Sequence, residues 1–524
     1  MLGILSKKSG QNGTEPSLVT GVFSITLSTI VVKTLGLFYK IPISSILGDE
    51  GMGYFNSAYT VYTFFFILCT AGVPKAVMIL ISEAKARGNK IEEGQIIYVA
   101  SLVFLSLGVL FTFLLCVFAR PLSTLIGNSN SYATIIAVAP SMIFVSLAGV
   151  IRGYLSANLK FLDIGVSGIV EGVGKLVLGL VFANLGSRLH LPLEIISALT
   201  ILGATLGSAF SLVYLLVGCK IKITNEKMGQ KRKIFALRSI IKRIFAISIP
   251  ITMSTAVMSM TSLIDLGLIM RCIRKIGLSE NSASALYGNY TTLAVPMLNL
   301  ALALITPISV TFLPKLTDCA VNKNIKEHTN AEKELLSLTS FISAPMVIGF
   351  MIFPREILEL LFKNSEIGIG AALLFTLAPS IAFASLLTNI NTILEANGKL
   401  SAPFISVSIG SAFKLIVSWI TISYTDLGIL GAPIGTVVSY AISLLVSLII
   451  YRNTLRKNLP IIGSIYKNYF LAFVSVGISR IIYDLFEKNS VSLFFSIGIG
   501  ALIFLAFSVM SGNIMILKRR KIAK

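Results

Sequence analysis

Seven ionisable residues lie within otherwise apolar stretches of the sequence: Lys33, Lys40, Lys75, Glu171, Lys175, Asp265 and Lys414. A charged side chain inside a membrane is costly, so such groups usually face a cavity and mark a binding or transport pathway. Five of the seven are lysines, and no chain of acidic groups accompanies them. This excess of positive charge favours an anionic substrate over a cationic one.

The surroundings of the first three lysines differ. Lys33 lies near the middle of its apolar stretch, where a lysine head cannot easily reach the interface. Lys40 follows two helical turns later on nearly the same face, and Lys75 follows the local break Gly72-Val73-Pro74. For Lys40 and Lys75 the alternative is snorkelling, in which the aliphatic stem lies in lipid and the ammonium reaches the interface.

The remaining charged residues suggest pairs. Glu171 and Lys175 are four residues apart in the order that favours an ion pair on a helix, so we expect them to pair within the cavity. Lys414 would then be the freer charge. Asp265 is a candidate counter-charge for a lysine of the first helix. Arg152 is expected at the cytoplasmic end of its helix, as an interfacial anchor or gating residue.

The composition indicates what positions these charges. Of the 524 residues 55% are hydrophobic and 13% charged, with a mean hydropathy of +0.87, whereas soluble proteins carry roughly 25% charged residues. Apolar stretches long enough to span a bilayer recur throughout, and we predict about 14 transmembrane helices. The stretches 18–47, 54–82 and 283–312 are over-long, which predicts tilt or kinks.

The basic residues predict the orientation. Most of the 44 lysines and arginines fall in alternate loops, and the positive-inside rule then places both termini in the cytoplasm. The dense run from Lys220 to Arg243 could bind nucleic acid, but contact with anionic lipid headgroups is the expected role. Residues 1–17 are polar and the first apolar stretch is long enough to be a permanent span, so we expect no cleavable signal peptide. We therefore expect a multi-pass protein of the bacterial cytoplasmic membrane.

Cysteine and histidine offer little for chemistry. The five cysteines lack CxxC spacing, which argues against a disulfide framework or a metal cluster. His190 and His328 are expected in loops on opposite sides of the membrane. The sequence predicts no metal site, no cofactor and no catalytic group.

Two segments match at a constant offset of 239 residues. Ala139-Pro140-Ser141 matches Ala378-Pro379-Ser380, and Lys175-Leu176 matches Lys414-Leu415. Each copy contains about six helices, an even number, so both enter the membrane from the same side, as in transporters with parallel repeats. We predict an all-α protein of two six-helix lobes that face each other across a central cavity. The expected segments are a cytoplasmic N-terminus (1–17), an N-terminal lobe (18–217), a basic linker (218–243), a C-terminal lobe (244–450), two additional helices (451–517) and a basic tail (518–524).

Several of these residues also fall into recognisable motifs. They are Lys33-Thr34-Leu35-Gly36 followed by Lys40, then Ala71-Gly72-Val73-Pro74, and Arg152-Gly153-Tyr154 leading to Ser167, Glu171 and Lys175. Their order and spacing resemble the polysaccharide-exporter branch of the MOP flippase superfamily. The resemblance implies a two-lobed fold with a cationic cavity. It also implies a lipid-linked sugar pyrophosphate as cargo, carried from the inner to the outer leaflet.

On this reading the pyrophosphate would bind to Lys33, Lys40, Lys75 and Lys414, the polyprenyl tail would lie between helices, and the protein would act as a monomer. One alternative is a cation-coupled exporter of the multidrug and toxin extrusion group, for which only Glu171 and Asp265 offer carboxylates. Another is a membrane glycosyltransferase or polymerase, which would need catalytic acids or histidines in larger outer loops. A structural scaffold would leave the lysines unexplained.

Overall fold

The computed structural model describes residues 18–218, 230–362, 367–399, 401–455, 462–486 and 489–510. The side chains of some residues within its helices, among them Lys33, also lie outside the described part. Within the described ranges every regular element is helical. This confirms the predicted all-α membrane architecture.

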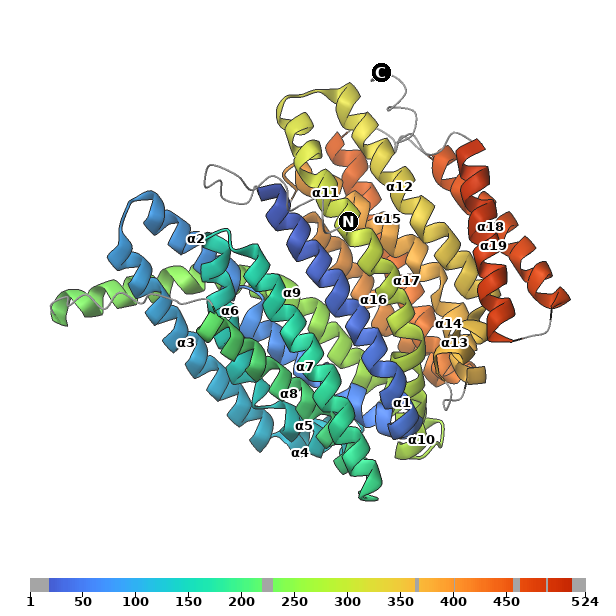
Figure 1. The fold of residues 1–524 in the computed structure, drawn as a ribbon, viewed down its shortest axis with the longest axis horizontal. Helices are drawn as coiled ribbons and strands as arrows, with labels where there is room; N and C mark the ends of the chain where they lie inside the picture. The colour runs from blue at the N-terminus through green and yellow to red at the C-terminus, as the bar shows by residue number, and fades with distance from the viewer. Residues whose placement is uncertain are drawn as a thin grey trace.

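The first half of the chain forms the N-lobe (Figure 1). Its helices are α1 (Leu18–Thr70), α2 (Val73–Ala86), α3 (Lys90–Val117), α4 (Ala119–Leu125), α5 (Tyr132–Val138), α6 (Ser141–Ala157), α7 (Phe161–Arg188) and α8 (Leu193–Gly218), with the short turn η1 (Ser129–Ser131).

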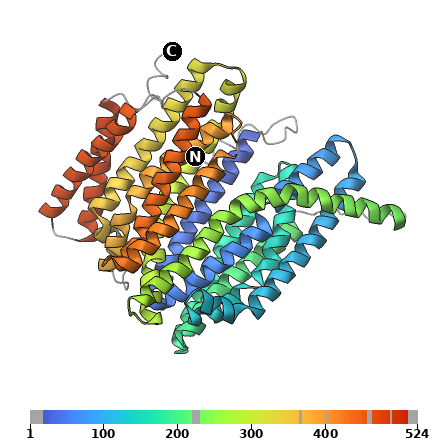
Figure 2. The ribbon, with the colours of Figure 1, turned by 180° about the vertical axis from the view of Figure 1, so that it is seen from behind.

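The long helix α9 (Gln230–Lys275) leads into the C-lobe. The C-lobe contains α10 (Glu280–Asn289), the π-turn η2 (Tyr290–Ala294), α11 (Val295–Val321), α12 (Ile325–Ile352), α13 (Pro354–Leu361), α14 (Ile367–Leu377), α15 (Pro379–Ala396), α16 (Ala402–Tyr424), η3 (Gly428–Leu430) and α17 (Gly431–Leu455). The two additional helices, α18 (Ile462–Leu485) and α19 (Ser490–Met510), pack at the edge of the C-lobe against α12 (Figure 2).

Eleven helical stretches among the described residues are long and apolar enough to cross a membrane, or 12 if the bent pair α5–α6 counts as one span. One of them, Thr34–Lys85, has 52 residues. At about 1.5 Å per residue it far exceeds a hydrocarbon core of about 30 Å, so it must contain two spans. Gly48, with φ of 63°, kinks α1 there, in a conformation that glycine tolerates best. The predicted number of about 14 is consistent with these helices.

The predicted irregularities are present. The break expected at Gly72-Val73-Pro74 separates α1 from α2. The over-long stretch 283–312 is interrupted by η2, and Pro296 follows as the second residue of α11. These interruptions free backbone groups from helical hydrogen bonding, which is tolerated inside a membrane only where other protein groups satisfy them.

The internal duplication is visible in the detailed geometry. The helix that ends at Ala157 and the one that ends at Ala396 are followed by Asn158 and Asn397, each donating from Nδ2 to the carbonyl four residues back at 2.7 Å. The next residues, Leu159 and Gly398, are both left-handed, with φ of 57° and 78°. The same local turn therefore connects α6 to α7 and α15 to α16.

The duplicated lysines lie on equivalent helix pairs. A Cβ added to Gly207 of α8 would lie 2.8 Å from the backbone nitrogen of Lys175 in α7, and one added to Gly435 of α17 would lie 3.1 Å from the carbonyl of Lys414 in α16. Small residues permit such close approach of helix backbones in membranes. The matched glycines thus fix each lysine-bearing helix against its neighbour.

The expected linker is only partly separate from the lobes. Residues 230–243 already belong to α9, whereas 219–229 lie outside the described residues. Ile240 and Ile244 pack against α2 and α3, and Arg243 forms ion pairs with Glu83 and Glu92 of those helices. The basic run thus continues into a helix that crosses from one lobe to the other. The predicted domain boundaries remain a prediction.

The lobes meet at one end of the molecule. We call the end with the α2–α3, α6–α7, α11–α12 and α15–α16 connections the basic end. At the opposite end the backbones touch: a Cβ on Gly53 would lie 2.1 Å from the carbonyl oxygen of Ser284, and one on Gly288 2.2 Å from that of Asp49. Figures 1 and 2 show the two groups of helices diverging toward the basic end.

We predict that Gly207→Ala lowers the midpoint of thermal unfolding in detergent, because the new methyl group meets the backbone of α7, which cannot move aside without separating the helices. Overpacking of this kind costs about 1–3 kcal/mol. The matched control is Gly349→Ala, where the added Cβ has nothing within 4 Å. Equal midpoints for the two variants would contradict the close packing of α7 and α8.

A cationic cavity as the candidate functional site

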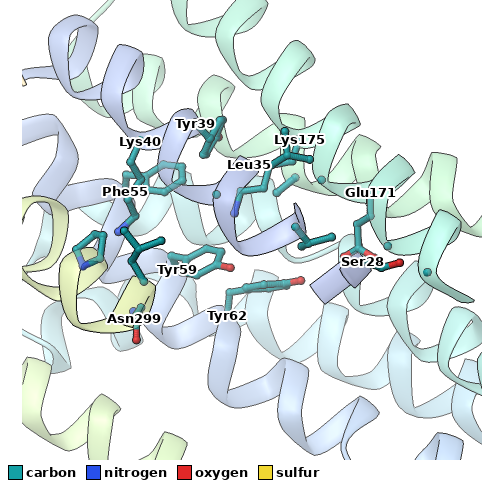
Figure 3. Close-up of a pocket in the computed structure, with 18 of the residues that line it drawn as sticks. Ser28, Leu35, Tyr39, Lys40, Phe55, Tyr59, Tyr62, Glu171, Lys175 and Asn299 are labelled. Atoms are coloured by element: carbon teal, nitrogen blue, oxygen red, sulfur yellow. The ribbon is translucent and has the colours of Figure 1, made fainter. Parts of the chain in front are cut away.

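A cavity of about 760 Å³ lies between α1, α6, α7, α8 and α11 (Figure 3). This is within the range of roughly 300–1,000 Å³ that small-molecule sites occupy. Its described lining includes three basic side chains, Lys40, Arg152 and Lys175, and one acidic side chain, Glu171. The cavity therefore carries an excess of positive charge.

One wall of the cavity is a face of α7. Gly165, Gly168 and Gly172 lie on it together with Glu171 and Lys175. Residues spaced three, four and seven apart share a helix face, and glycines on that face leave room for a ligand beside the two charged side chains.

Arg152 reaches into this wall from α6. Its Nη2 donates to Glu171 Oε2 at 2.8 Å and to Ser211 Oγ at 3.0 Å, and its Nε donates to Ser167 Oγ at 3.1 Å. The expected pairing of Glu171 with Lys175 is therefore wrong, because the Glu171 carboxylate forms its ion pair with Arg152 of the neighbouring helix α6. A planar guanidinium can bind several acceptors at once, which a single ammonium does less well. Arg152 is a cavity residue as well as a helix-end residue.

Lys175 instead lies against aromatic rings. Its ammonium is 5.1 Å from the ring centroid of Tyr39 and 4.3 Å from that of Tyr59, which is cation–π geometry. Tyr39 is held in place by a hydrogen bond from its hydroxyl to the carbonyl of Thr200. Among the described residues no carboxylate forms an ion pair with Lys175, so its positive charge is not neutralised.

A row of aromatic side chains forms a second wall. Phe55, Tyr59 and Tyr62 line the cavity from one face of α1, with ring centroids 6.1 Å apart for the first pair and 5.5 Å for the second. Figure 3 shows the hydroxyl groups of Tyr59 and Tyr62 pointing toward the side of the cavity where Glu171 lies. Sequence reasoning missed these residues, although their spacing places them on one helix face.

Lys40 lies where the cavity approaches the junction of the lobes. Its Nζ donates to the carbonyl of Thr291 at 2.8 Å and to Asn56 Oδ1 at 3.2 Å. Lys40 and Lys175 line the same cavity, so their positive charges repel each other. Two ammonium groups brought together without a shared carboxylate form a site that favours an anion.

The lysine of the second copy has a different environment. Lys414 Nζ is 2.7 Å from Asp265 Oδ2, and Asp265 is 5% exposed. The expected pairing of Asp265 with a lysine of the first helix is wrong, because α9 packs against α16 and brings the two partners together within the C-lobe. Lys414 is consequently not a free charge.

Three further residues were assigned roles or positions from the sequence. Lys75 is exposed near the start of α2, outside the cavity lining, and interacts electrostatically with Glu395 at the end of α15. The side chain of Lys33 lies outside the described residues. His328 is not in a loop: it is buried in α12, with its Nδ1 3.1 Å from Glu332 Oε1.

Comparisons with known proteins agree with this architecture. Residues 18–319, more than half of the chain, match the model of a family described as polysaccharide biosynthesis protein. Stage V sporulation protein B of Bacillus subtilis (strain 168) is 23% identical over 472 residues, which cover 88% of each chain. Lipid II flippase MurJ of the same organism is 23% identical over 460 residues, 83% of this chain and 82% of that protein.

Solved structures show the same fold. Lipid II flippase MurJ in an inward closed conformation has a TM-score of 0.72 at 18% identity and covers 94% of this chain and 99% of its own. An inward-facing multidrug resistance transporter of the MATE family, itself in the MOP superfamily, has a TM-score of 0.67 at 16% identity, covering 83% and 98%. The chain therefore belongs to the polysaccharide biosynthesis protein family and has the fold of MOP superfamily transporters.

Proposed function

We propose that this protein is a flippase that moves a polyprenyl-pyrophosphate-linked saccharide across the cytoplasmic membrane by alternating access. The observation that carries this proposal is the cavity with Lys40, Arg152 and Lys175 on its walls and Glu171 as its described acidic residue. The relationship to lipid II flippase MurJ supports a lipid-linked cargo.

The pyrophosphate group would bind between Lys40 and Lys175. Each ammonium has three donors, and a bound dianion relieves the repulsion between the two charges. Hydrogen bonds to described residues use Nε and Nη2 of Arg152, so its Nη1 remains available for a phosphate oxygen. Lys33 precedes Lys40 by two turns of α1, and we propose that it also contributes to binding of the pyrophosphate group.

The saccharide would lie on the aromatic wall. A sugar ring presents an apolar face of C–H groups, which packs against the electron-rich face of an aromatic ring. Tyr59 adjoins Lys175, and Tyr62 follows it along α1, so a sugar joined directly to the phosphate reaches both rings. The hydroxyl groups of these tyrosines and the amide of Asn299 on the cavity lining offer hydrogen bonds to sugar hydroxyls.

The positive-inside rule places the basic end in the cytoplasm, so the cavity would receive its cargo from the inner leaflet. The polyprenyl tail would remain in lipid, between helices. The basic loops would contact anionic headgroups, and one copy of the chain contains the whole cavity, in keeping with a monomer.

The main alternative is a cation-coupled multidrug exporter, since a MATE transporter shares the fold. A cationic drug needs an available carboxylate in the cavity. Glu171 is tied to Arg152, and Asp265 is tied to Lys414. Both carboxylates thus have cationic partners, which disfavours this function.

We predict that Lys175→Gln weakens binding of undecaprenyl pyrophosphate and slows flipping of a lipid-linked disaccharide in proteoliposomes. Loss of one charge-assisted hydrogen bond corresponds to roughly tenfold to hundredfold weaker binding. Lys326→Gln, an exposed lysine at the basic end, is the control. Unchanged binding and flipping by the Lys175 variant, with normal expression, would remove this residue from the site.

We predict that Tyr62→Leu affects binding of the saccharide part of the cargo and not binding of the pyrophosphate part. Loss of an aromatic contact should weaken binding of the lipid-linked disaccharide by roughly twofold to tenfold, with little effect on undecaprenyl pyrophosphate, which has no sugar. Tyr98→Leu, on the outer surface of α3 with 55% exposure, controls for the substitution itself. Equal weakening of both ligands would show that the ring supports the cavity and does not contact the saccharide.

A further inference from the structure

The π-turn η2 leaves one backbone carbonyl without a helical partner. The N–H of Val295 donates to the carbonyl of Tyr290, five residues back. The carbonyl of Thr291 would next receive the N–H of residue 296, which is a proline and has none. A carbonyl inside a membrane protein must find a donor elsewhere. π-turns of this kind are frequent at functional sites.

That donor comes from the other lobe. Lys40 of α1 donates to the Thr291 carbonyl at 2.8 Å and to Asn56 Oδ1 at 3.2 Å. Asn56 in turn donates from Nδ2 to Thr292 Oγ1 at 2.8 Å, and both side chains are almost completely buried. Lys40 and Asn56 together therefore join the N-lobe to η2 of the C-lobe.

These contacts belong to a larger polar junction at the opposite end, which we call the seal. It consists of the contacts that Lys40, residues 53–60 and residues 128–130 of the N-lobe make with residues 281–292 of the C-lobe. Thr60 Oγ1 and the hydroxyl oxygen of Tyr287 are hydrogen-bonded at 3.3 Å, and Asn128 Nδ2 donates to Ser284 Oγ at 3.2 Å. Lys40 differs from these residues because it both joins the seal and lines the cavity.

A neighbouring residue at this junction has buried polar atoms without a partner in the described part of the chain. Asn289, at the end of α10, is 1% exposed, yet neither its Oδ1 nor its Nδ2 has a hydrogen-bond partner among the described residues. A buried amide left unsatisfied is unfavourable, and opening of the seal would expose it to water or to new partners.

We infer that Lys40 couples cargo binding to opening of the seal. In this structure its ammonium supplies the missing donor to Thr291 and joins the two lobes. A phosphate in the cavity attracts the ammonium more strongly than a neutral carbonyl does. Once Lys40 turns to the phosphate, Thr291 loses its donor, and the open state, in which water reaches that carbonyl, becomes favoured. The response to phosphate rests on the proposed function, whereas the hold on Thr291 does not.

The test measures exposure of Ser284, which is fully buried in the seal. Ser284→Cys is introduced into the full chain after its five cysteines are replaced by serine, and labelling by a membrane-impermeant maleimide is followed in proteoliposomes. With Lys40 intact, inorganic pyrophosphate should raise the labelling rate about tenfold, the effect of one hydrogen bond to a charged group. Lys40→Met should raise the rate to that level without pyrophosphate and abolish any further response. Lys326→Met should behave like the parent.

The outcomes separate the two proposals. Slow labelling of Lys40→Met without pyrophosphate would overturn the inference whatever the cargo is. Fast labelling of Lys40→Met, with no response of the parent to pyrophosphate, would overturn the anionic cargo and leave Lys40 only a structural contact. If Lys40→Met does not fold, Thr292→Val, which removes the bond from Asn56 but keeps the charge, should give faster labelling that still responds to pyrophosphate. Unchanged labelling of that folded variant would also overturn the inference.

Discussion

The hydrocarbon core of a membrane supplies no hydrogen bonds, so every charged or backbone polar group within it must be satisfied by the protein or face a cavity. The buried charges of this chain meet that constraint in different ways. Asp265 and Lys414 neutralise each other, Glu171 is held by Arg152, and Lys175 lies on tyrosine rings. The character of the cavity follows from which charges are neutralised and which are not.

Duplication produced the scaffold, and divergence produced the site. Lys175 and Lys414 occupy equivalent positions, each on a helix held against a glycine of the next one. In the C-lobe an aspartate of α9 cancels the lysine. In the N-lobe the helix that packs against α7 presents Tyr39 and Tyr59 instead. Aromatic rings stabilise an ammonium without removing its charge, so the N-lobe keeps a cation that can still bind an anion.

The sequence predicted the features that depend on local pattern. Long apolar stretches predicted the membrane spans, and Gly72-Val73-Pro74 predicted a break between helices. Residues matched at a constant offset predicted the internal duplication. It failed where partners come from another helix. The spacing of Glu171 and Lys175 is favourable on an isolated helix, but tertiary packing brings Arg152 closer to the carboxylate. Similarly, aromatic residues in an apolar stretch look like lipid-facing or core positions, and nothing local marks Tyr59 and Tyr62 as cavity residues.

His328 shows the same limitation at a helix end. The polar run around it resembles a loop, yet Asn324 caps the helix by accepting a hydrogen bond from the backbone N–H of Glu327, and α12 begins there. Side-chain caps of this kind satisfy the first free N–H groups of a helix. The histidine is then buried beside Glu332, one turn further along. Whether His328 lies in a loop or in a helix thus depends on where the helix is capped, and the cap is at Asn324.

The distribution of charge also bears on how the two lobes can move. A buried ion pair is costly to separate, and the pairs Arg152–Glu171 and Asp265–Lys414 each lie within one lobe or its packed helices. They can remain intact while the lobes rotate, so each lobe can move as a rigid body. The seal contacts named above join neutral groups, or one charged group to a neutral one, and water can replace such bonds at small net cost. The ion pairs therefore keep each lobe in shape, and the polar contacts of the seal can be exchanged for water, as the proposed alternating access would require.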